Sequence, residues 1–298
     1  MSAWTRQVVD RGSYVLLSGL MGRLEGRPEA VVHARGARIG RIGALFSPGR
    51  TAVAVENLGR AFPEMPLAER KALAVKVWEH FGSVAADFLS SRGRSLVQLE
   101  STTVVVGQDV VDKALAQGRG ALMISGHLGN WERIAAWLSL SGYPLSIIIR
   151  DANQQDVNRL VNSVRESTGS KIIARGRATR TILERLHANE IVAMLSDQNS
   201  DDAFIPLFGH MAGIATGAGV LADRTGCAVF SGACMHQGEG RYKLEFTDNI
   251  QPIGVNSFKG EAWMRGIHRW LEEEIRQNPE QWLWIHDRWR SAKHAGLV

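Results

Sequence analysis

One segment of the sequence places a histidine and a glutamate where they could share a proton-transfer reaction. The apolar residues 121–124 are typical of a buried strand, and His127 follows them closely. Asn130 is a favourable cap for a helix that begins at Trp131, which would put Glu132 in the first helical turn. A carboxylate that binds one imidazole nitrogen fixes the tautomer and leaves the other nitrogen as a base. This pattern predicts His127 as a general base for a substrate hydroxyl, oriented by Glu132.

The same pattern has a simpler interpretation. A buried histidine can be satisfied by its neighbours, and Glu132 can merely complement the positive end of a helix dipole. However, Gly126 and Gly129 flank the histidine and would let a substrate approach the backbone closely. Both interpretations stay open on this segment alone.

The composition is that of a globular protein. The 298 residues are 45% hydrophobic and 22% charged, and no apolar run approaches the roughly 20 residues of a transmembrane helix. Cys227 and Cys234 are the only cysteines, and their apolar setting predicts reduced core residues of a cytoplasmic protein. No spacing of histidines, cysteines and carboxylates matches a metal-binding motif, so we expect no metal site.

The positive charge is concentrated in the first part of the chain. Residues 1–60 contain nine arginines and four acidic residues, a formal charge of +5 that equals the net charge of the whole chain. Apolar side chains are interleaved with these arginines, which suits the anionic surface of a membrane. An ordinary solvated helix face is the alternative. Nucleic acid is disfavoured because no nucleic-acid motif accompanies the charge. We therefore predict a basic amphipathic, membrane-associating arm over residues 1–60.

Residues 61–298 alternate between strand and helix patterns. A helix with an apolar stripe follows Pro66. Beyond it we expect strands at residues 104–106, 121–125, 145–149, 171–173, 190–195, 227–235 and 242–246, and helices at residues 108–117, 131–140, 154–167, 178–188, 216–225 and 258–277. This succession predicts an α/β domain, in which a mostly parallel sheet with one antiparallel hairpin carries helices on both faces.

Six segments occur in the order in which a known family carries them. They are residues 57–64, the His-x4-Glu block at 126–132, Arg150, the Asp-Gln pair at 197–198, residues 204–209 with Thr216, and residues 279–290. Together they resemble the lipid A biosynthesis lauroyl/myristoyl acyltransferases, bacterial membrane-surface enzymes related to the glycerolipid acyltransferases. The family usually begins with a long membrane-spanning helix, whereas the N-terminal segment here is short and interrupted by glycines.

This resemblance implies a fatty acyl transfer from an acyl-carrier-protein or CoA thioester to a hydroxyl of a lipid A precursor or related glycolipid. His127 would take the proton of that hydroxyl, Glu132 would hold Nδ1, and backbone N–H groups at 126–130 are candidates for stabilising the oxyanion. The thioester is a co-substrate, and no cofactor is expected. The expected partners are the acyl carrier protein or CoA thioester, the lipid acceptor and an anionic membrane. The expected location is the cytoplasmic face of the inner membrane, as a peripheral or monotopic protein.

Four polar residues beyond other expected strands are candidates for substrate binding. The guanidinium of Arg150 suits two hydrogen bonds to a phosphate of the donor or acceptor. Asp197 and Gln198 could orient Arg150 or the acceptor, and Arg175 has a weaker claim. An exposed arginine at the start of a loop and simple loop capping are the structural alternatives.

Other functions stay open. Within the same chemistry, the acceptor could be a phosphatidylinositol mannoside or a lysophospholipid. Glu132 favours lipid A, because the mannoside enzymes tend to carry aspartate at that position. In a different class, the chain could be a non-catalytic lipid-binding protein of the membrane surface. The retention of both His127 and Glu132 argues against that class.

Overall fold

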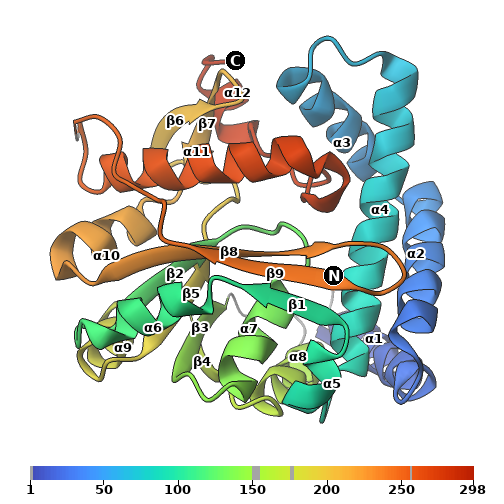
Figure 1. The fold of residues 1–298 in the computed structure, drawn as a ribbon. Coiled ribbons are helices and arrows are strands. Elements are labelled where there is room, and N and C mark those ends of the chain that lie inside the picture. The colour runs from blue at the N-terminus through green and yellow to red at the C-terminus, as the bar shows by residue number, and fades with distance from the viewer. Residues whose placement is uncertain (1–2, 150–154, 175–177, 256) are drawn as a thin grey trace.

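Four helices form the N-terminal part of the computed structural model, which describes residues 3–149, 155–174, 178–255 and 257–298. They are α1 (Ala3–Leu24), α2 (Glu29–Phe46), α3 (Pro48–Ala61) and α4 (Leu67–Ser90). In Figure 1, α2 and α4 lie side by side along one edge of the molecule. The helix predicted after Pro66 is thus confirmed as α4.

Glycines bring α2 and α4 close together. A Cβ atom on Gly40 would lie 1.9 Å from the carbonyl oxygen of Trp78, and one on Gly82 would lie 2.2 Å from the carbonyl oxygen of Gly36. Any larger side chain at these positions would force the two helices apart. The glycines that look like interruptions in the sequence are therefore contact points between helices.

Residues 29–61 pack against the body of the protein. The side-chain amide of Asn57 donates to the carbonyl oxygens of Trp284 and His286, both at 2.8 Å. The division predicted after residue 60 lies one residue before the end of α3, and it stays a prediction. Among the described residues, no helix combines the length and the apolar character needed to cross a bilayer. The association of this N-terminal segment with a membrane stays a prediction.

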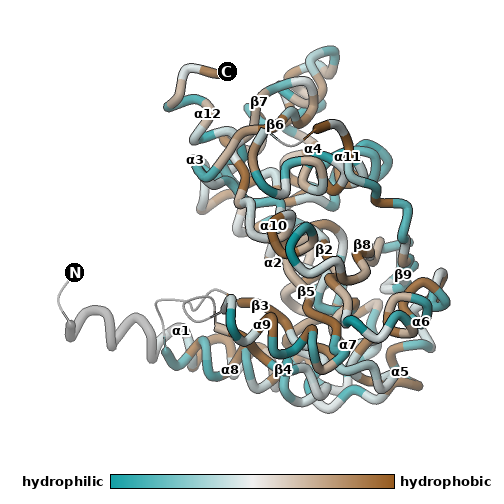
Figure 2. Tube along the Cα trace, turned by 90° about the vertical axis from the view of Figure 1, so that its left-hand side faces the viewer, coloured by the Kyte–Doolittle hydropathy of each residue, from teal (hydrophilic) through white to brown (hydrophobic). Residues whose placement is uncertain are grey.

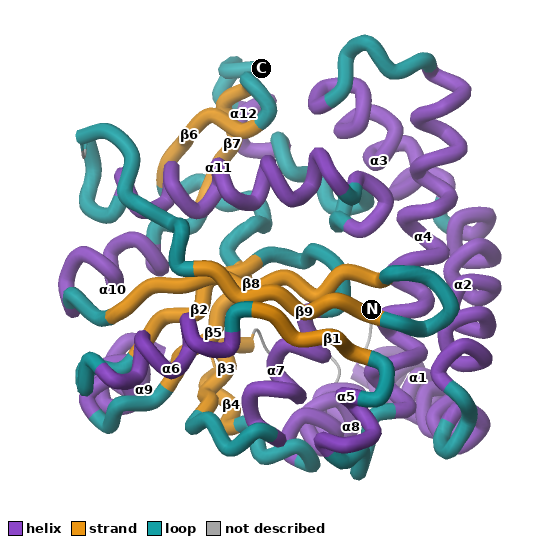
Figure 3. Tube along the Cα trace, in the orientation of Figure 1, coloured by secondary structure: helices purple, strands orange, loops and turns teal. Residues whose placement is uncertain are grey.

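The centre of the protein is a seven-stranded sheet (Figure 3). Its strands in chain order are β1 (Thr103–Val106), β2 (Ala121–Ser125), β3 (Leu145–Ile149), β4 (Lys171–Ala174), β5 (Ile191–Leu195), β8 (Ala228–His236) and β9 (Tyr242–Thr247). Across the sheet the order is β1-β9-β8-β2-β5-β3-β4. Every neighbouring pair is parallel except β8 and β9, which form the predicted antiparallel hairpin. The predicted α/β class is confirmed.

Helices cover both faces of this sheet, as predicted. One face carries α10 (Gly217–Thr225) and α11 (Glu261–Gln277), and the other carries α6 (Gln108–Ala116) and α7 (Trp131–Leu140). The remaining helical elements are α5 (Leu96–Glu100), α8 (Gln155–Glu166), α9 (Ala178–His187), the 3-10 turn η2 (Pro279–Gln281) and α12 (Arg290–His294).

The alternation of side chains along β2 explains the two layers. Leu122 and Ile124 pack toward α11, whereas Ala121 and Met123 pack toward α7. All four are buried, because a central parallel strand is covered on both faces. The apolar run in the sequence is therefore the middle of the core, and His127 emerges directly from it.

A separate antiparallel hairpin lies beyond α11 (Figure 3). It consists of β6 (Ala203–Leu207) and β7 (His210–Ile214). In Figure 2 the hairpin lies at the far end of the molecule from α1. No strand is predicted here from the sequence, because Pro206 and the turn at residues 208–209 interrupt the strand pattern.

Candidate active site

The sheet brings together two residues that are 70 positions apart in the chain. β2 and β5 are parallel neighbours, and their last residues, Ser125 and Leu195, are register partners. His127 and Asp197 each lie two residues further on and meet at the carboxyl edge of the sheet, where α/β proteins bind ligands. The Nδ1 atom of His127 lies 2.8 Å from Asp197 Oδ1, and its backbone N–H donates to Oδ2 at 2.7 Å.

Asp197 is a buried carboxylate that the protein itself surrounds with donors. The indole N–H of Trp282 donates to Oδ2 at 2.9 Å, in addition to the two contacts from His127. Burial raises the pKa of this carboxyl, but the charge of His127 and the hydrogen bonds outweigh it and hold the pKa well below its usual range. Gly126 permits the close approach, because a Cβ atom on it would lie 3.0 Å from Oδ2.

The imidazole of His127 is fixed at one nitrogen and accessible at the other. Burial lowers its pKa, whereas the charge and the hydrogen bond of Asp197 raise it, and the net result is a pKa above the ordinary 6.5. The side chain keeps 20% of its surface exposed. Its Nε2 atom lies 3.5 Å from the side-chain nitrogen of Gln198, and the ring of Trp131 stands edge-on with its centroid 5.0 Å away.

Glu132 does not hold Nδ1 of the histidine, contrary to the prediction. Its carboxylate binds Arg165 of α8 at 3.1 Å and 2.5 Å and accepts the indole N–H of Trp131 at 3.1 Å. The first turn of α7 directs this side chain toward α8, whereas His127 lies on the loop before α7 and faces Asp197. The charge of Glu132 raises the pKa of His127, but less than Asp197 does.

The conformation of the loop between β2 and α7 is tightly constrained. Gly129 has a φ of +57°, and a Cβ atom on it would lie 2.2 Å from the carbonyl oxygen of Cys234. Asn130 is confirmed as the cap of α7, because its side-chain oxygen accepts the backbone N–H of Arg133 at 3.2 Å. Its amide also donates to Asp87 of α4 at 2.7 Å. This loop therefore presents His127 on a rigid support.

A buried ion network lies behind that loop. Nε and Nη2 of Arg133 each lie 2.9 Å from an oxygen of Asp87, and the guanidinium lies 3.9 Å from the ring centroid of Tyr242. Glu29, the first residue of α2, binds the same guanidinium, and Arg94 binds Asp87 at 3.0 Å. Burial raises the Asp87 pKa, but the two arginines outweigh it and hold the pKa well below its usual range. The start of α2 is thus part of the support for the active-site loop.

The structure describes two of the four residues that are predicted to bind substrate. Arg150 and Arg175 lie outside the described residues, so their roles stay predictions. Gln198 is exposed and lies beside His127. The buried carboxylate of Asp197 holds His127, because β5 lies next to β2 in the sheet. The role predicted for Asp197 in orienting Arg150 or the acceptor stays a prediction.

An apolar pocket of about 60 Å³ opens beside the Glu132–Arg165 ion pair. The three adjacent strands β2, β5 and β3 supply one wall, and α7 supplies the opposite one. The apolar residues that line it include Met123, Ile134, Ile147, Ile149, Ala193 and Leu195. A hydrocarbon chain would find only apolar contacts along these residues, with a charged pair at one side.

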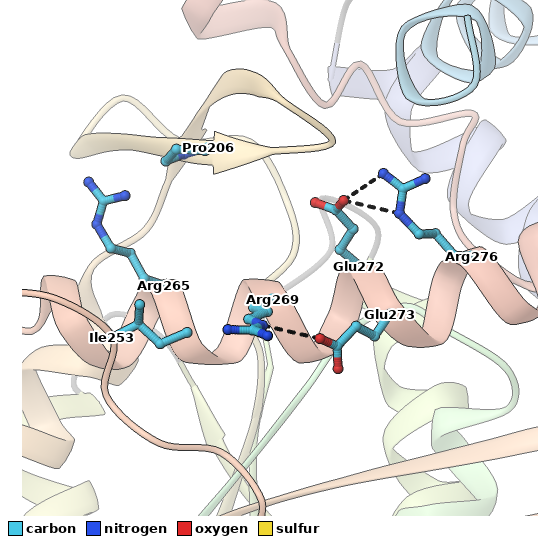
Figure 4. Close-up of a pocket in the computed structure, with 7 residues that line it drawn as sticks. All are labelled: Pro206, Ile253, Arg265, Arg269, Glu272, Glu273 and Arg276. Atoms are coloured by element: carbon cyan, nitrogen blue, oxygen red, sulfur yellow. Dashed lines mark hydrogen bonds and ion pairs between the residues drawn. The ribbon is translucent and has the colours of Figure 1, made fainter. Parts of the chain in front are cut away.

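A larger hollow of about 340 Å³ lies between α11 and β6 (Figure 4). Four of its charged side chains form two pairs, Arg276–Glu272 at 2.7 Å and Arg269–Glu273 at 3.1 Å. It shares no lining residue with the apolar pocket beside Glu132. We therefore assign the chemistry to the edge of the sheet and not to this hollow.

Residues 279–290, near the C-terminus, include side chains that support the active site. The sequence does not reveal these roles. Trp282 binds Asp197, and Nε2 of His286 accepts the backbone N–H of Asn199 at 3.0 Å. Arg288 is 1% exposed, and its positive charge acts on the same buried carboxylate. The only signal in the sequence is the density of aromatic and basic residues at positions 279–290.

This arrangement is equipped for general-base catalysis. A buried carboxylate holds Nδ1–H, which leaves the lone pair of Nε2 directed at the accessible side of the ring. In the parts of the chain that the structure describes, no three His, Cys, Asp or Glu side chains gather as a metal site would require. The residues at hand suit removal of a proton from a hydroxyl that approaches Nε2.

Comparison with known proteins assigns the chain to a family. The family model described as bacterial lipid A biosynthesis acyltransferase matches residues 5–291. The chain belongs to this family. The protein is therefore an acyltransferase of lipid A biosynthesis type, as the six segments of the sequence predict.

Relatives of this acyltransferase are named either as lipid A biosynthesis enzymes or as phosphatidylinositol mannoside acyltransferases. A lipid A biosynthesis palmitoleoyltransferase from Escherichia coli is 25% identical over 276 residues, which cover 89% of this chain and 86% of the relative. A lipid A biosynthesis lauroyltransferase from the same organism is 24% identical over 275 residues, covering 89% and 87%. A phosphatidylinositol mannoside acyltransferase from Mycobacterium tuberculosis is 24% identical over 243 residues, covering 78% and 75%. All three names describe acyl transfer.

Proposed function

We propose that this acyltransferase moves a fatty acyl chain from an acyl-carrier-protein or CoA thioester to a hydroxyl of a lipid A precursor or related glycolipid. The observation that carries the proposal is the 2.8 Å contact of His127 Nδ1 with the buried Asp197, in a chain of this family. The names of two relatives favour lipid A, and the mannoside enzyme is the reason to keep a phosphatidylinositol mannoside as the second candidate acceptor.

The reaction needs one base and proceeds without an acyl-enzyme. Nε2 of His127 takes the proton of the acceptor hydroxyl as its oxygen attacks the thioester carbonyl, which forms a C–O bond and an oxyanion. Asp197 stays ionised and stabilises the resulting imidazolium. When the C–S bond breaks, the thiolate of the carrier leaves and takes the proton from Nε2. The products are an ester and a free thiol, and His127 returns to its neutral form.

The apolar pocket beside Glu132 is the proposed site for one part of the acyl chain, because about 60 Å³ is too small to hold a whole fatty acyl chain. Its walls are mostly aliphatic, and each buried CH₂ contributes about 0.8 kcal/mol to binding. The Glu132–Arg165 pair contributes to the lining, so its charges would mark the end of the pocket that faces the thioester or the acceptor. The thioester is a co-substrate in this account, and no cofactor is invoked.

Membrane attachment is the remaining part of the proposal. Ile42, Leu45 and Phe46 near the end of α2 are exposed by 54%, 77% and 83%, and exposed arginines at 38 and 41 lie on the same helix. Apolar side chains with nearby cations suit shallow insertion into an anionic lipid surface. We therefore propose that residues 1–60 hold the enzyme on the cytoplasmic face of the inner membrane as a peripheral or monotopic protein.

Loss of charge from residues 1–60 should weaken vesicle binding. We expect glutamine substitutions to reduce binding to anionic vesicles by several-fold to several hundred-fold at low salt, because each basic residue contributes about 1 kcal/mol. The substituted residues are Arg6, Arg11, Arg23 and Arg27. The measurement is co-sedimentation of the full-length protein with vesicles across a salt series.

A matched control removes four positive charges elsewhere. Glutamine substitutions outside the N-terminal segment should leave vesicle binding close to that of the wild type; suitable exposed positions are Arg119, Arg180, Arg224 and Arg269. If both variants bind alike, or if binding ignores salt, the electrostatic part of the attachment is wrong. The assignment of the chemistry would not be affected.

The proposed function predicts a specific change in cellular lipids. A strain without the gene should accumulate glycolipid that lacks one acyl chain, and mass spectrometry should detect the missing mass. Restoring the wild-type gene should restore the chain, whereas a His127→Ala gene should not. An unchanged lipid profile on deletion, in a strain with no second gene of this family, would contradict the proposal.

A further inference from the structure

We propose that the side-chain amide of Gln198 is a further catalytic residue, which donates hydrogen bonds to the oxyanion formed in acyl transfer. The inference rests on the proposed function, since an oxyanion arises only if a hydroxyl attacks a carbonyl. It gives Gln198 a role in the transition state, in place of the acceptor binding predicted from the sequence.

The reaction requires a donor close to Nε2 of His127. The attacking oxygen must lie within hydrogen-bonding distance of Nε2. The carbonyl oxygen is only two bonds away from the attacking oxygen, because both are bonded to the carbonyl carbon. Donors that stabilise such an oxyanion need to reach within about 2.7–3.1 Å of it. Any group that serves this purpose must therefore lie a few ångströms from Nε2, on its accessible side.

Three backbone donors of the active-site loop are already engaged. The N–H of His127 donates to Asp197 at 2.7 Å, that of Gly129 to the carbonyl oxygen of Gln281 at 2.9 Å, and that of Asn130 to Cys234 at 2.7 Å. These bonds fix the loop and bury the donors within the protein. The sequence makes the backbone at 126–130 a candidate for the oxyanion site, and the structure removes three of its five members.

Gln198 has the required position. Its side-chain nitrogen lies 3.5 Å from Nε2 of His127, and its side chain is exposed. At 3.5 Å this contact is long for a hydrogen bond, so the amide can turn to a better acceptor at little cost. A developing oxyanion beside Nε2 is such an acceptor, because hydrogen bonds to charged groups are about twice as strong as neutral ones.

The backbone on both sides of Gln198 is anchored. Asp197 is held by the contacts from His127 and Trp282 already described. The side-chain amide of Asn199 donates to the hydroxyl of Ser291 at 2.8 Å, and its oxygen accepts the backbone N–H of the same residue at 3.1 Å. The backbone that carries this exposed side chain is therefore fixed, and only the amide has to turn toward the oxyanion.

Kinetics separate this role from acceptor binding. We expect Gln198→Ala to lower kcat by about 10²- to 10³-fold while the KM values of both substrates change by less than about threefold. Gln198→Glu, which keeps the shape but removes the donors and adds a negative charge, should be at least as slow. Because Gln198 is exposed, both variants should melt within a degree or two of the wild type, and the exposed Gln277→Ala should be normal in every respect.

Binding of two donor analogues supplies a readout independent of turnover. A phosphonate analogue of the tetrahedral intermediate carries the anionic oxygen, whereas a thioether analogue of the acyl donor lacks the carbonyl oxygen. Gln198→Ala should weaken the phosphonate by about 10²-fold and leave the thioether unchanged. Equal loss of both analogues, a raised acceptor KM with unchanged kcat, or normal activity of Gln198→Ala would each overturn the inference. If the wild type transfers no acyl chain, the proposed function fails instead.

Discussion

Substituting His127 with alanine is expected to lower kcat for acyl transfer by about 10²- to 10⁴-fold, the usual value of general-base assistance. Nε2 is the only atom in this account that accepts the proton of the hydroxyl, and the remaining loop cannot replace it. The fold should persist, because the imidazole is partly exposed and lies outside the apolar core. Steady-state kinetics and thermal unfolding of the purified variant measure the two effects separately.

The matched control for this variant is His187→Ala. His187 is an exposed residue at the end of α9, so its loss removes an imidazole without touching the sheet edge. It should retain wild-type activity. Transfer by His127→Ala at more than about a tenth of the wild-type rate would show that another group takes the proton, since loss of the base should cost at least about 10²-fold.

The second large effect is expected for Asp197→Asn, with a loss of kcat of about 10²- to 10⁴-fold. Oδ2 accepts from the His127 backbone and from Trp282, so the amide oxygen of the asparagine must occupy that position. The amide nitrogen then faces Nδ1 and donates to it, which places the imidazole proton on Nε2. That tautomer has no lone pair at Nε2 and cannot act as the base.

Two further measurements identify the cause of that loss. Asp201→Asn, an exposed change four residues along the chain, should be close to normal. The double variant His127→Ala/Asp197→Asn should be about as slow as His127→Ala alone, because groups that act as one unit do not add their effects. An active Asp197→Asn enzyme, or effects that multiply in the double variant, would mean that Asp197 does not act through His127.

The same contact predicts a pH dependence of the wild type. His127 must be neutral to accept a proton, so kcat/KM should rise with pH through the pKa of this residue. Burial lowers that pKa and Asp197 raises it to a net value above 6.5, so the acidic limb should lie above pH 6.5. In Asp197→Asn the raising charge is gone while the burial remains, and the limb of the residual activity should therefore move to lower pH.

The sequence reveals His127 and the strand that carries it, because both depend on local patterns. An apolar run, a glycine and an N-cap lie within ten residues of one another, and each has a known structural meaning. The mostly parallel sheet follows from the same kind of evidence. Each strand and its following helix are local features, and their alternation permits few topologies.

Local sequence patterns cannot identify the residue that holds His127. Asp197 lies 70 residues away and meets the histidine only because β5 is next to β2, and strand order is not written in any local pattern. Once β2 and β5 are paired with Ser125 opposite Leu195, the meeting of positions 127 and 197 follows by counting. Glu132 is the natural choice from sequence, because it is near in the chain, but the start of α7 turns it toward Arg165.

The N-terminal segment illustrates a different limit. Its glycines and arginines suggest a loose basic arm, yet Gly36, Gly40 and Gly82 let α2 pack closely on α4. Glu29 then reaches Arg133 in the buried network behind the active-site loop. A charge that looks like part of a solvated surface in the sequence is thus paired in the interior. Composition could not distinguish these two environments, because only the fold decides which side of a helix is covered.

Acyl transfer by the purified protein tests the central claim most directly. The protein is mixed with a fatty acyl thioester, on acyl carrier protein or on CoA, and with a lipid A precursor, a phosphatidylinositol mannoside or a lysophospholipid, and the lipids are analysed by mass spectrometry. We expect one added acyl chain on the lipid A precursor with at least one donor, and at least about 10²-fold less product from His127→Ala. No acylated product from any pair, or equal product from His127→Ala, would contradict it.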